Sequence, residues 1–194
     1  MGTIKTTNIE PIADNGTVTL GSSGDTFTMP SGVTMTVPSG GLSGQNYPAW
    51  YVSLSADQTF SDIITAKIQF NTEAFDTDNI YDNSTNYRIT IPSGKEGKYY
   101  IKTNVFVDAQ AVSNLNRAVV YIYKNDSIVV QSFQDYRNNP SQKINVNVST
   151  ILDLVVGDYI EIFAYGDTNN SGTGVFRGDT SVSESWFQGF RIGD

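Results

Sequence analysis

The sequence contains neither cysteine nor histidine among its 194 residues. Without cysteine it can form no disulfide and offers no thiolate to a metal. Without histidine it lacks the commonest general base, the commonest zinc ligand and the usual switch near neutral pH. Charged residues make up only 16%, and the net charge of −8 argues against nucleic-acid binding, because neutralising phosphates requires clustered lysine and arginine. The same acidity disfavours docking on an anionic membrane surface.

Long apolar runs, helical periodicity and catalytic motifs are absent as well. No apolar run is long enough to insert across a membrane, and the first residues lack the basic and apolar regions of a signal peptide. No segment repeats its apolar residues with a period of 3.6, so we expect almost no helix. Serines have no histidine to activate them, and no phosphate-binding glycine loop is present. We therefore predict a protein that is not an enzyme and needs no cofactor.

One group of carboxylates is dense enough to be tested as a site. Glu73, Asp76, Asp78 and Asp82 lie close together in the sequence. They lack the glycine-spaced loop of a calcium-binding hand, and nothing marks two of them as an acid and base pair. We interpret the group as a solvated loop and leave open whether the protein binds a metal.

Two alternating runs lie on either side of a Gly-Asp turn in residues 145–165. A period of two indicates pleated strands, and the turn between them predicts a hairpin in which Gly157 takes a positive φ and Asp158 accepts bonds from turn amides. In the second run Ile160, Ile162 and Ala164 share one face, while Tyr159, Glu161, Phe163 and Tyr165 share the other. We expect an inner strand with one face on the core and the other against a further layer, such as another copy of the chain.

The front of the chain differs from the rest. Residues 1–15 have no period and are interpreted as an extended arm, whereas residues 16–47 hold very short alternating units separated by Pro-Ser-Gly turns and end in a hinge. The apolar rows of these units are Val18, Leu20, Phe27, Met29, Val33, Met35 and Val37. They are too narrow for an independent core. They either lie on the following domain or meet the same rows of other copies around an axis, and we favour the second.

Residues 48–194 contain many alternating segments between polar turns, which is typical of a β-sandwich or barrel. Six motifs follow in order: AWYV at 49–52, KIQFN at 67–71, GKYYI at 97–101, YIYKND at 121–126, LDLVVGDYI at 152–160 and WFQGFRI at 186–192. In this order they resemble the jelly-roll head of the complement-globular-head and tumour-necrosis-factor superfamily. The resemblance implies an all-β fold, a ten-strand sandwich that associates as a tight homotrimer, and no catalytic residues.

The front segment carries a second resemblance. Residues 15–33, NGTVTLGSSGDTFTMPSGV, are similar to shaft segments of bacteriophage tail fibres and other phage surface proteins. This implies a structural virion component, made in the host cytoplasm and placed on the virion surface. Its N-terminal arm would contact other virion proteins, and its head would project toward a host surface glycan or protein. Two alternatives stay open, a capsid decoration protein and a glycan-binding receptor module.

These interpretations select two sets of residues. The candidates for the trimer interface are Val18, Leu20, Phe27, Met29, Val33, Met35, Val37, Tyr99, Tyr159 and Phe163. The candidates for stacking on sugar rings are the loop aromatics Tyr47, Tyr81, Tyr136 and Phe176.

Overall fold

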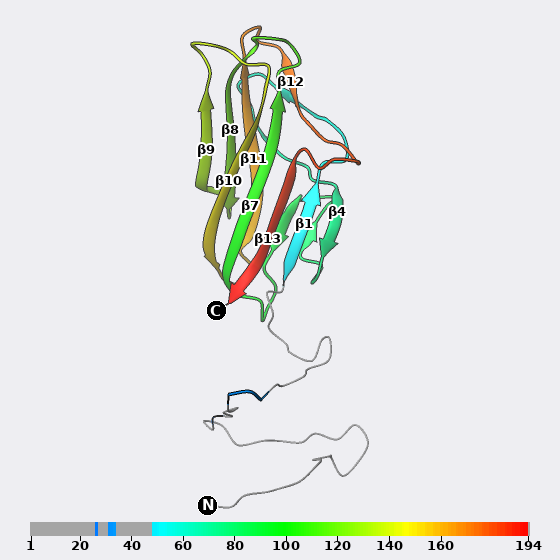
Figure 1. Ribbon diagram of the computed structural model, residues 1–194, viewed down its shortest axis with the longest axis vertical. Coiled ribbons are helices and arrows are strands. Elements are labelled where there is room, and N and C mark those ends of the chain that lie inside the picture. Colours follow the sequence, from blue (N-terminus) through cyan, green and yellow to red (C-terminus); the bar gives the residue numbers. More distant parts are fainter. Residues whose placement is uncertain (1–25, 27–30, 34–47, 194) are drawn as a thin grey trace, which may run out of the picture. The chain divides into compact units, whose positions relative to one another are not determined.

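The computed structural model describes residue 26, residues 31–33 and residues 48–193 of the chain. By internal contacts the chain divides into two units, Met1–Ser43 and Gly44–Asp194. All regular structure in the described residues is β-strand, and its thirteen strands form two antiparallel sheets (Figure 1). The expected all-β sandwich is therefore confirmed. The described residues hold no helix with the length and apolar character needed to cross a membrane.

The first sheet is built on its longest strands. Its members are β1 (Ala49–Ser53), β2 (Gln58–Ser61), β4 (Thr72–Asp76), β7 (Gly97–Asp108), β10 (Lys143–Leu154), β12 (Thr173–Phe176) and β13 (Trp186–Gly193). Their order is β2-β12-β7-β13-β1-β4, and β10 pairs with β7 over its whole length. Strand β7 thus lies between β10 on one edge and both β12 and β13 on the other.

The second sheet lies behind the first in Figure 1. Its members are β3 (Thr65–Lys67), β5 (Tyr81–Asp82), β6 (Arg88–Thr90), β8 (Leu115–Lys124), β9 (Ser127–Asp135) and β11 (Tyr159–Thr168). The order is β5-β6-β11-β8-β9, with β3 beside β11. Because β11 is paired on both edges, it is an inner strand, as its two-sided pattern predicted.

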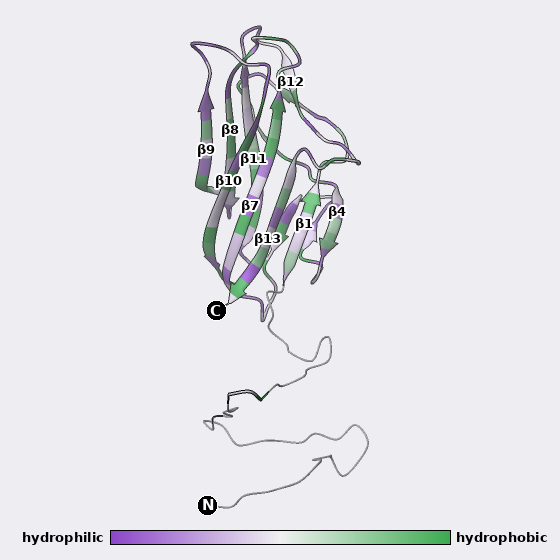
Figure 2. Cartoon of the chain, in the orientation of Figure 1, coloured by the Kyte–Doolittle hydropathy of each residue, from purple (hydrophilic) through white to green (hydrophobic). Residues whose placement is uncertain are grey.

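The core fills the space between the sheets. Alternate residues of β7 are buried, and Figure 2 shows hydrophilic and hydrophobic stretches interleaved along the strands of its sheet. The inward rows predicted for β11 are confirmed, since Ile160, Ile162 and Ala164 are all buried. Trp50 packs edge-on against Phe187 at 5.4 Å between ring centroids. Fully burying a side chain of this size contributes about 1.5–3 kcal/mol.

The predicted hairpin across residues 155–158 is wrong. Strands β10 and β11 belong to different sheets, and the turn carries the chain from one layer of the sandwich to the other. The local chemistry is as expected: Gly157 has φ of 87°, and the Val155 amide donates to Asp158 Oδ2 at 2.9 Å. Two further bonds, between Gly157 N and Ile91 O and between Ile91 N and Asp158 O, tie the turn to the segment after β6. A tight reversal therefore need not pair the strands that it connects.

Candidate functional site

Most of the front-segment candidates lie outside the described residues. This applies to Val18, Leu20, Phe27, Met29, Met35 and Val37, and also to Tyr47. The described part includes the predicted turn at Ser31 and Gly32, with Gly32 at φ of 86°, and next to it Val33 with 55% of its surface exposed.

Three aromatic candidates lie in the chain's own core, which corrects the expectations for them. Tyr99 is fully buried between the sheets and donates its hydroxyl to the Lys95 carbonyl, so it has no surface left for a neighbouring copy. Tyr81 is buried and donates to the Phe70 carbonyl at 3.0 Å. Phe176 stacks on Phe60 at 4.8 Å between centroids. Tyr81 and Phe176, which were assigned to loops, are here the anchors that hold the short strands β5 and β12 on the core.

The remaining glycan candidate, Tyr136, lies just after β9. Its side chain is half-buried, and its backbone amide donates to the Asn116 carbonyl at 2.6 Å. Tyr136 does not line either of the two pockets described at the surface of the head.

Tyr159 and Phe163 project from the outward side of β11. The Phe163 ring packs on Tyr123 at 4.3 Å, with the Lys67 ammonium 5.6 Å from its centroid. The Tyr159 hydroxyl donates to Asp126 at 2.6 Å, and this hydrogen bond raises the pKa of Tyr159. Lys67 is also paired with the buried Glu161. These side chains of β11 thus contact their neighbours within the sheet, and the predicted contact of Phe163 with another copy stays a prediction.

The outward side of the first sheet carries a second set of aromatic residues, here called the aromatic face: Tyr51, Phe75, Tyr100, Trp186 and Phe190. Tyr51 lies between Phe75 at 6.4 Å and Trp186 at 5.9 Å, and Tyr100 packs on Phe190 at 5.6 Å. They come from four strands that are neighbours in the sheet: β4, β1, β13 and β7.

Much of this apolar surface is open to solvent. Phe75 is 50% exposed and Phe190 36% exposed, and the aliphatic Ile151 and Ile192 beside them are equally open. Sequence reasoning missed the face because its members lie in four separate segments that only the pairing of β1, β4, β7 and β13 brings together. The alternation in each segment was the available signal, but it does not say which row points outward.

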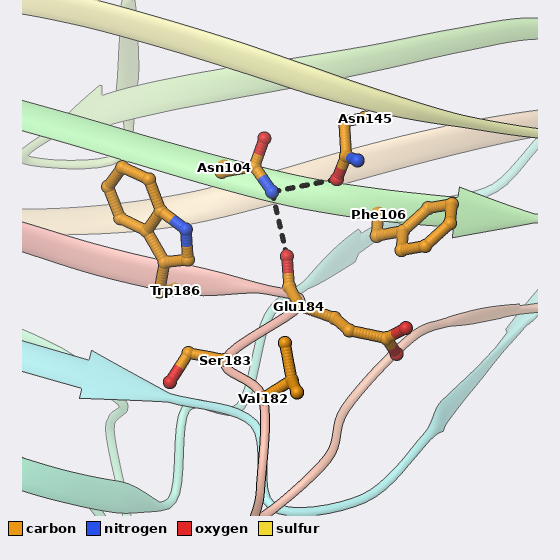
Figure 3. A pocket seen from close by; sticks show the side chains of 7 residues that line it. All are labelled: Asn104, Phe106, Asn145, Val182, Ser183, Glu184 and Trp186. Carbon is orange, nitrogen blue, oxygen red and sulfur yellow. Dashed lines mark hydrogen bonds between the residues drawn. The ribbon is translucent and has the colours of Figure 1, made fainter.

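A pocket opens where the aromatic face ends at Trp186. It encloses about 480 Å³ and is lined by Asn104, Phe106, Asn145, Val182, Ser183, Glu184 and Trp186. Figure 3 shows the two amide side chains lying between the indole and the phenyl ring, with Val182 and Ser183 opposite them. Strands β7, β10 and β13 provide one wall, and the segment before β13 provides the other.

Hydrogen bonds hold this second wall on the sheet. The Asn104 side-chain amide donates to Asn145 Oδ1 at 2.9 Å and to the Glu184 carbonyl at 2.7 Å (Figure 3). Next to them the Phe106 amide donates to Ser185 Oγ at 3.0 Å. These bonds within the chain fix the second wall of the pocket to the sheet.

The charges around the pocket are unevenly matched. Its one lining carboxylate, Glu184, turns away from the amides in Figure 3 and lies 3.3 Å from Arg177 Nε. The Lys102 ammonium lies 5.7 Å from the Trp186 ring centroid, and that of Lys143 lies 5.8 Å from the Phe106 centroid. Within the described residues neither lysine forms an ion pair, and the carboxylate nearest to them in the strand register is Asp108, opposite Lys143.

The acidic group of residues 73–82 does not converge on a common point. Asp82 accepts the backbone amides of Ser84 and Thr85, which hold its pKa well below the ordinary value. Asp78 is paired with Lys95 at 2.8 Å, and Asp76 accepts the Tyr81 amide. In the described part of the chain, no three acidic side chains are grouped as a metal site would require. Asp76 and Asp82 accept hydrogen bonds from nearby backbone amides, and Asp78 forms an ion pair.

Comparison with known proteins gives the class of fold. No family model and no curated protein matches the sequence. Among solved structures, the globular domain of zebrafish complement 1qA protein aligns with a TM-score of 0.51 at 17% identity, covering 75% of this chain and 97% of that one. The Eiger tumour necrosis factor of S. frugiperda aligns with a TM-score of 0.56 at 12% identity, covering 77% and 95%. The head is thus a jelly roll of the complement 1q and tumour-necrosis-factor type, and these identities show the fold alone.

Proposed function

We propose that the chain is a non-enzymatic interaction module that assembles as a homotrimer and forms part of a phage virion surface. The observation that carries the proposal is the aromatic face. A contiguous apolar patch that is partly open to solvent marks an interaction surface. Aromatic residues are enriched at the centres of such interfaces. A second copy of the chain is the occupant proposed here for the end of the face that holds Tyr100 and Phe190, with Trp186 at the other end left open, in keeping with the homotrimer that the sequence motifs of the head imply.

The place on a virion rests on the front segment. Its likeness to phage shaft sequences supports a role for residues 1–47 in attachment to other virion proteins, with the head directed outward for host adsorption. A tail-fibre-like protein fits this arrangement, and a capsid decoration protein is the alternative. A cryo-EM map of purified particles separates the two, because a fibre appears in a few copies at the tail and a decoration protein in many copies over the capsid. Absence from the particles would overturn both.

Assembly through the aromatic face is tested by light scattering on matched variants. Wild-type protein is expected to have three times the mass of the chain at micromolar concentration. Ile151→Lys adds a charge beside Tyr100 and should shift the protein to monomers, because an unpaired charge in an apolar interface is costly. Ile64→Lys is the control, since Ile64 is about as exposed as Ile151 but lies in the turn before β3. A monomeric wild type, or equal effects of the two variants, would contradict the proposal.

A further inference from the structure

The pocket beside Trp186 is built for a ligand with an apolar ring face, several hydroxyl groups and negative charge. We propose that it binds a carboxylated sugar, such as a uronic acid unit of a surface polysaccharide. This inference deepens the host-adsorption part of the proposed function, on which it rests, by naming the chemistry of the receptor and the residues that meet it.

Shape and apolar contact come from the two aromatic side chains. Trp186 and Phe106 stand on the same outward side of neighbouring strands, since Trp186 pairs with Asn104 and Phe106 lies two residues further along β7. Their rings border a pocket of about 480 Å³, a size typical of small-molecule sites. The C–H face of a pyranose ring is apolar and stacks on such rings, while the rest of the sugar stays polar.

The polar contacts come from the amides between the rings. Asn104 uses its side-chain amide group to donate to Asn145 and Glu184, and its carbonyl oxygen has no described donor. The Asn145 amide group likewise has no described acceptor. An acceptor and a donor are thus left in the pocket, and sugar hydroxyl groups both donate and accept. Because the Asn104 bonds hold both amides in place before binding, little ordering is required of the protein.

The preference for a carboxylate comes from the lysines. Lys102 and Lys143 lie at the indole and phenyl ends of the pocket, and neither has an ion-pair partner in the part of the chain that the structure describes. Glu184, which would repel an anion, is held by Arg177. In a chain of net charge −8, two unmatched cations beside one pocket favour an anionic ligand locally.

The head contains its own reporter for the test. The two tryptophans of the chain are Trp50, which is fully buried, and Trp186, which lines the pocket. We would titrate the full-length protein with tetragalacturonate and, separately, with the neutral tetrasaccharide maltotetraose, following tryptophan emission at low salt. Tetragalacturonate is expected to change the emission and to bind at least about tenfold more tightly than maltotetraose. Trp186→Phe should abolish the change, because only Trp50 then remains.

The lysines are tested by a matched pair of variants. Lys102→Gln combined with Lys143→Gln should weaken tetragalacturonate binding by about tenfold and leave maltotetraose binding unchanged. Lys98→Gln removes a cation from the same side of β7, four residues from Lys102, and should have no effect. Absence of binding to tetragalacturonate, equal binding of the two sugars, or equal effects of the two lysine sets would overturn the inference.

Occupation of the pocket by a neighbouring copy is a separate outcome. It would shield Trp186 from acrylamide quenching in the assembled protein, and this result would also overturn the inference. Light scattering on the same samples keeps the two proposals apart. A monomer that binds tetragalacturonate retains the sugar site and loses the homotrimer, whereas a trimer that does not bind it loses the sugar site alone.

Discussion

At the scale of single residues, the packing of the sandwich depends on a site where a large side chain lies directly against a glycine. Trp50 of β1 faces Gly189 of β13 across the pair, and its indole covers the glycine Cα. A Cβ on residue 189 would overlap the indole ring and would lie 2.7 Å from the Tyr100 carbonyl oxygen. The ring is fully buried, and neither it nor the backbone can move aside without a large cost in free energy. The glycine in the closing motif is therefore required by packing rather than by backbone dihedrals.

Gly189→Ala should consequently destabilise the head. Overpacking a filled core costs about 1–3 kcal/mol, and we expect a loss of that size in the free energy of unfolding measured by urea denaturation. Gly172→Ala is the matched control, because a Cβ there would meet only the exposed side chain of Asn170, which can rotate away. Its expected effect is within about 0.5 kcal/mol. Equal losses in the two variants would show that the contact with Trp50 is not the cause.

The aromatic residues show what sequence patterns do and do not reveal at this scale. Alternation correctly separated the two faces of β11, since Ile160, Ile162 and Ala164 are buried. It could not tell that Tyr81 and Phe176 are buried, because both lie in strands too short for a period to be visible. Tyr99 was assigned to an interface, whereas the structure buries it and satisfies its hydroxyl inside the protein with a backbone carbonyl.

At the scale of elements, strands were easier to predict than their partners. The long runs that became β7, β8, β10 and β11 were recognised from their period, and the sandwich followed from their number. Pairing depends on contacts far apart in the sequence. Strand β10 pairs with β7, not with β11 next to it in the chain, because the turn between them crosses the sandwich. The aromatic face and the pocket were missed for the same reason, since several distant segments build each of them.

The turn between β10 and β11 is stabilised by bonds to the Asp158 carboxylate, and their contribution to stability depends on pH. Burial raises the pKa of Asp158, but bonds from Lys124, the Val155 amide and Asn125 outweigh burial and leave the pKa below its ordinary value of 3.8. The Lys124 ammonium lies 2.7 Å from Asp158 Oδ2, and the Asn125 amide 2.7 Å from Oδ1. The folded state therefore favours the carboxylate more than the unfolded state does. This stabilisation is complete above the unfolded pKa and is lost as pH falls through the lower folded value.

Asp158→Asn should lower the free energy of unfolding by about 1.5–3 kcal/mol at neutral pH, the range for hydrogen bonds to a charged group. The difference in the free energy of unfolding between wild type and variant should narrow as pH falls below 3.8. The wild-type carboxylate is then protonated and loses the charge that the asparagine variant lacks at every pH. Asp153→Asn is the control, since Asp153 is an exposed residue of β10 whose distance to the Lys98 ammonium is 4.0 Å. A difference between wild type and Asp158→Asn that does not vary with pH would mean that the turn relies on shape alone.

At the scale of the whole molecule, the head combines a closed interior with an incompletely covered exterior. Its two sheets enclose one continuous core drawn from both, from Trp50 near the start of the head to Phe187 near its end. The outward side of the second sheet carries cations such as Lys67 and Arg88 over its aromatic rings, and its strand β9 leaves Ile128 and Phe133 about half exposed. The aromatic face of the first sheet leaves Phe75 and Phe190 open. Assembly through the first sheet is favoured because its aromatic residues come from four neighbouring strands and contact one another.

The position of the core and of the aromatic face predicts that residues 44–194 fold and assemble without the front of the chain. Because every described residue of the core lies within this unit, the shortened chain should unfold in one cooperative transition. Because the aromatic face also lies within it, its mass in light scattering should be three times that of one shortened chain. Ile151→Lys in the shortened chain should reduce that mass to one copy, as in the full chain. A folded but monomeric head would instead place the assembling surface in residues 1–43, where the apolar rows of the short alternating units would then have to hold the copies together.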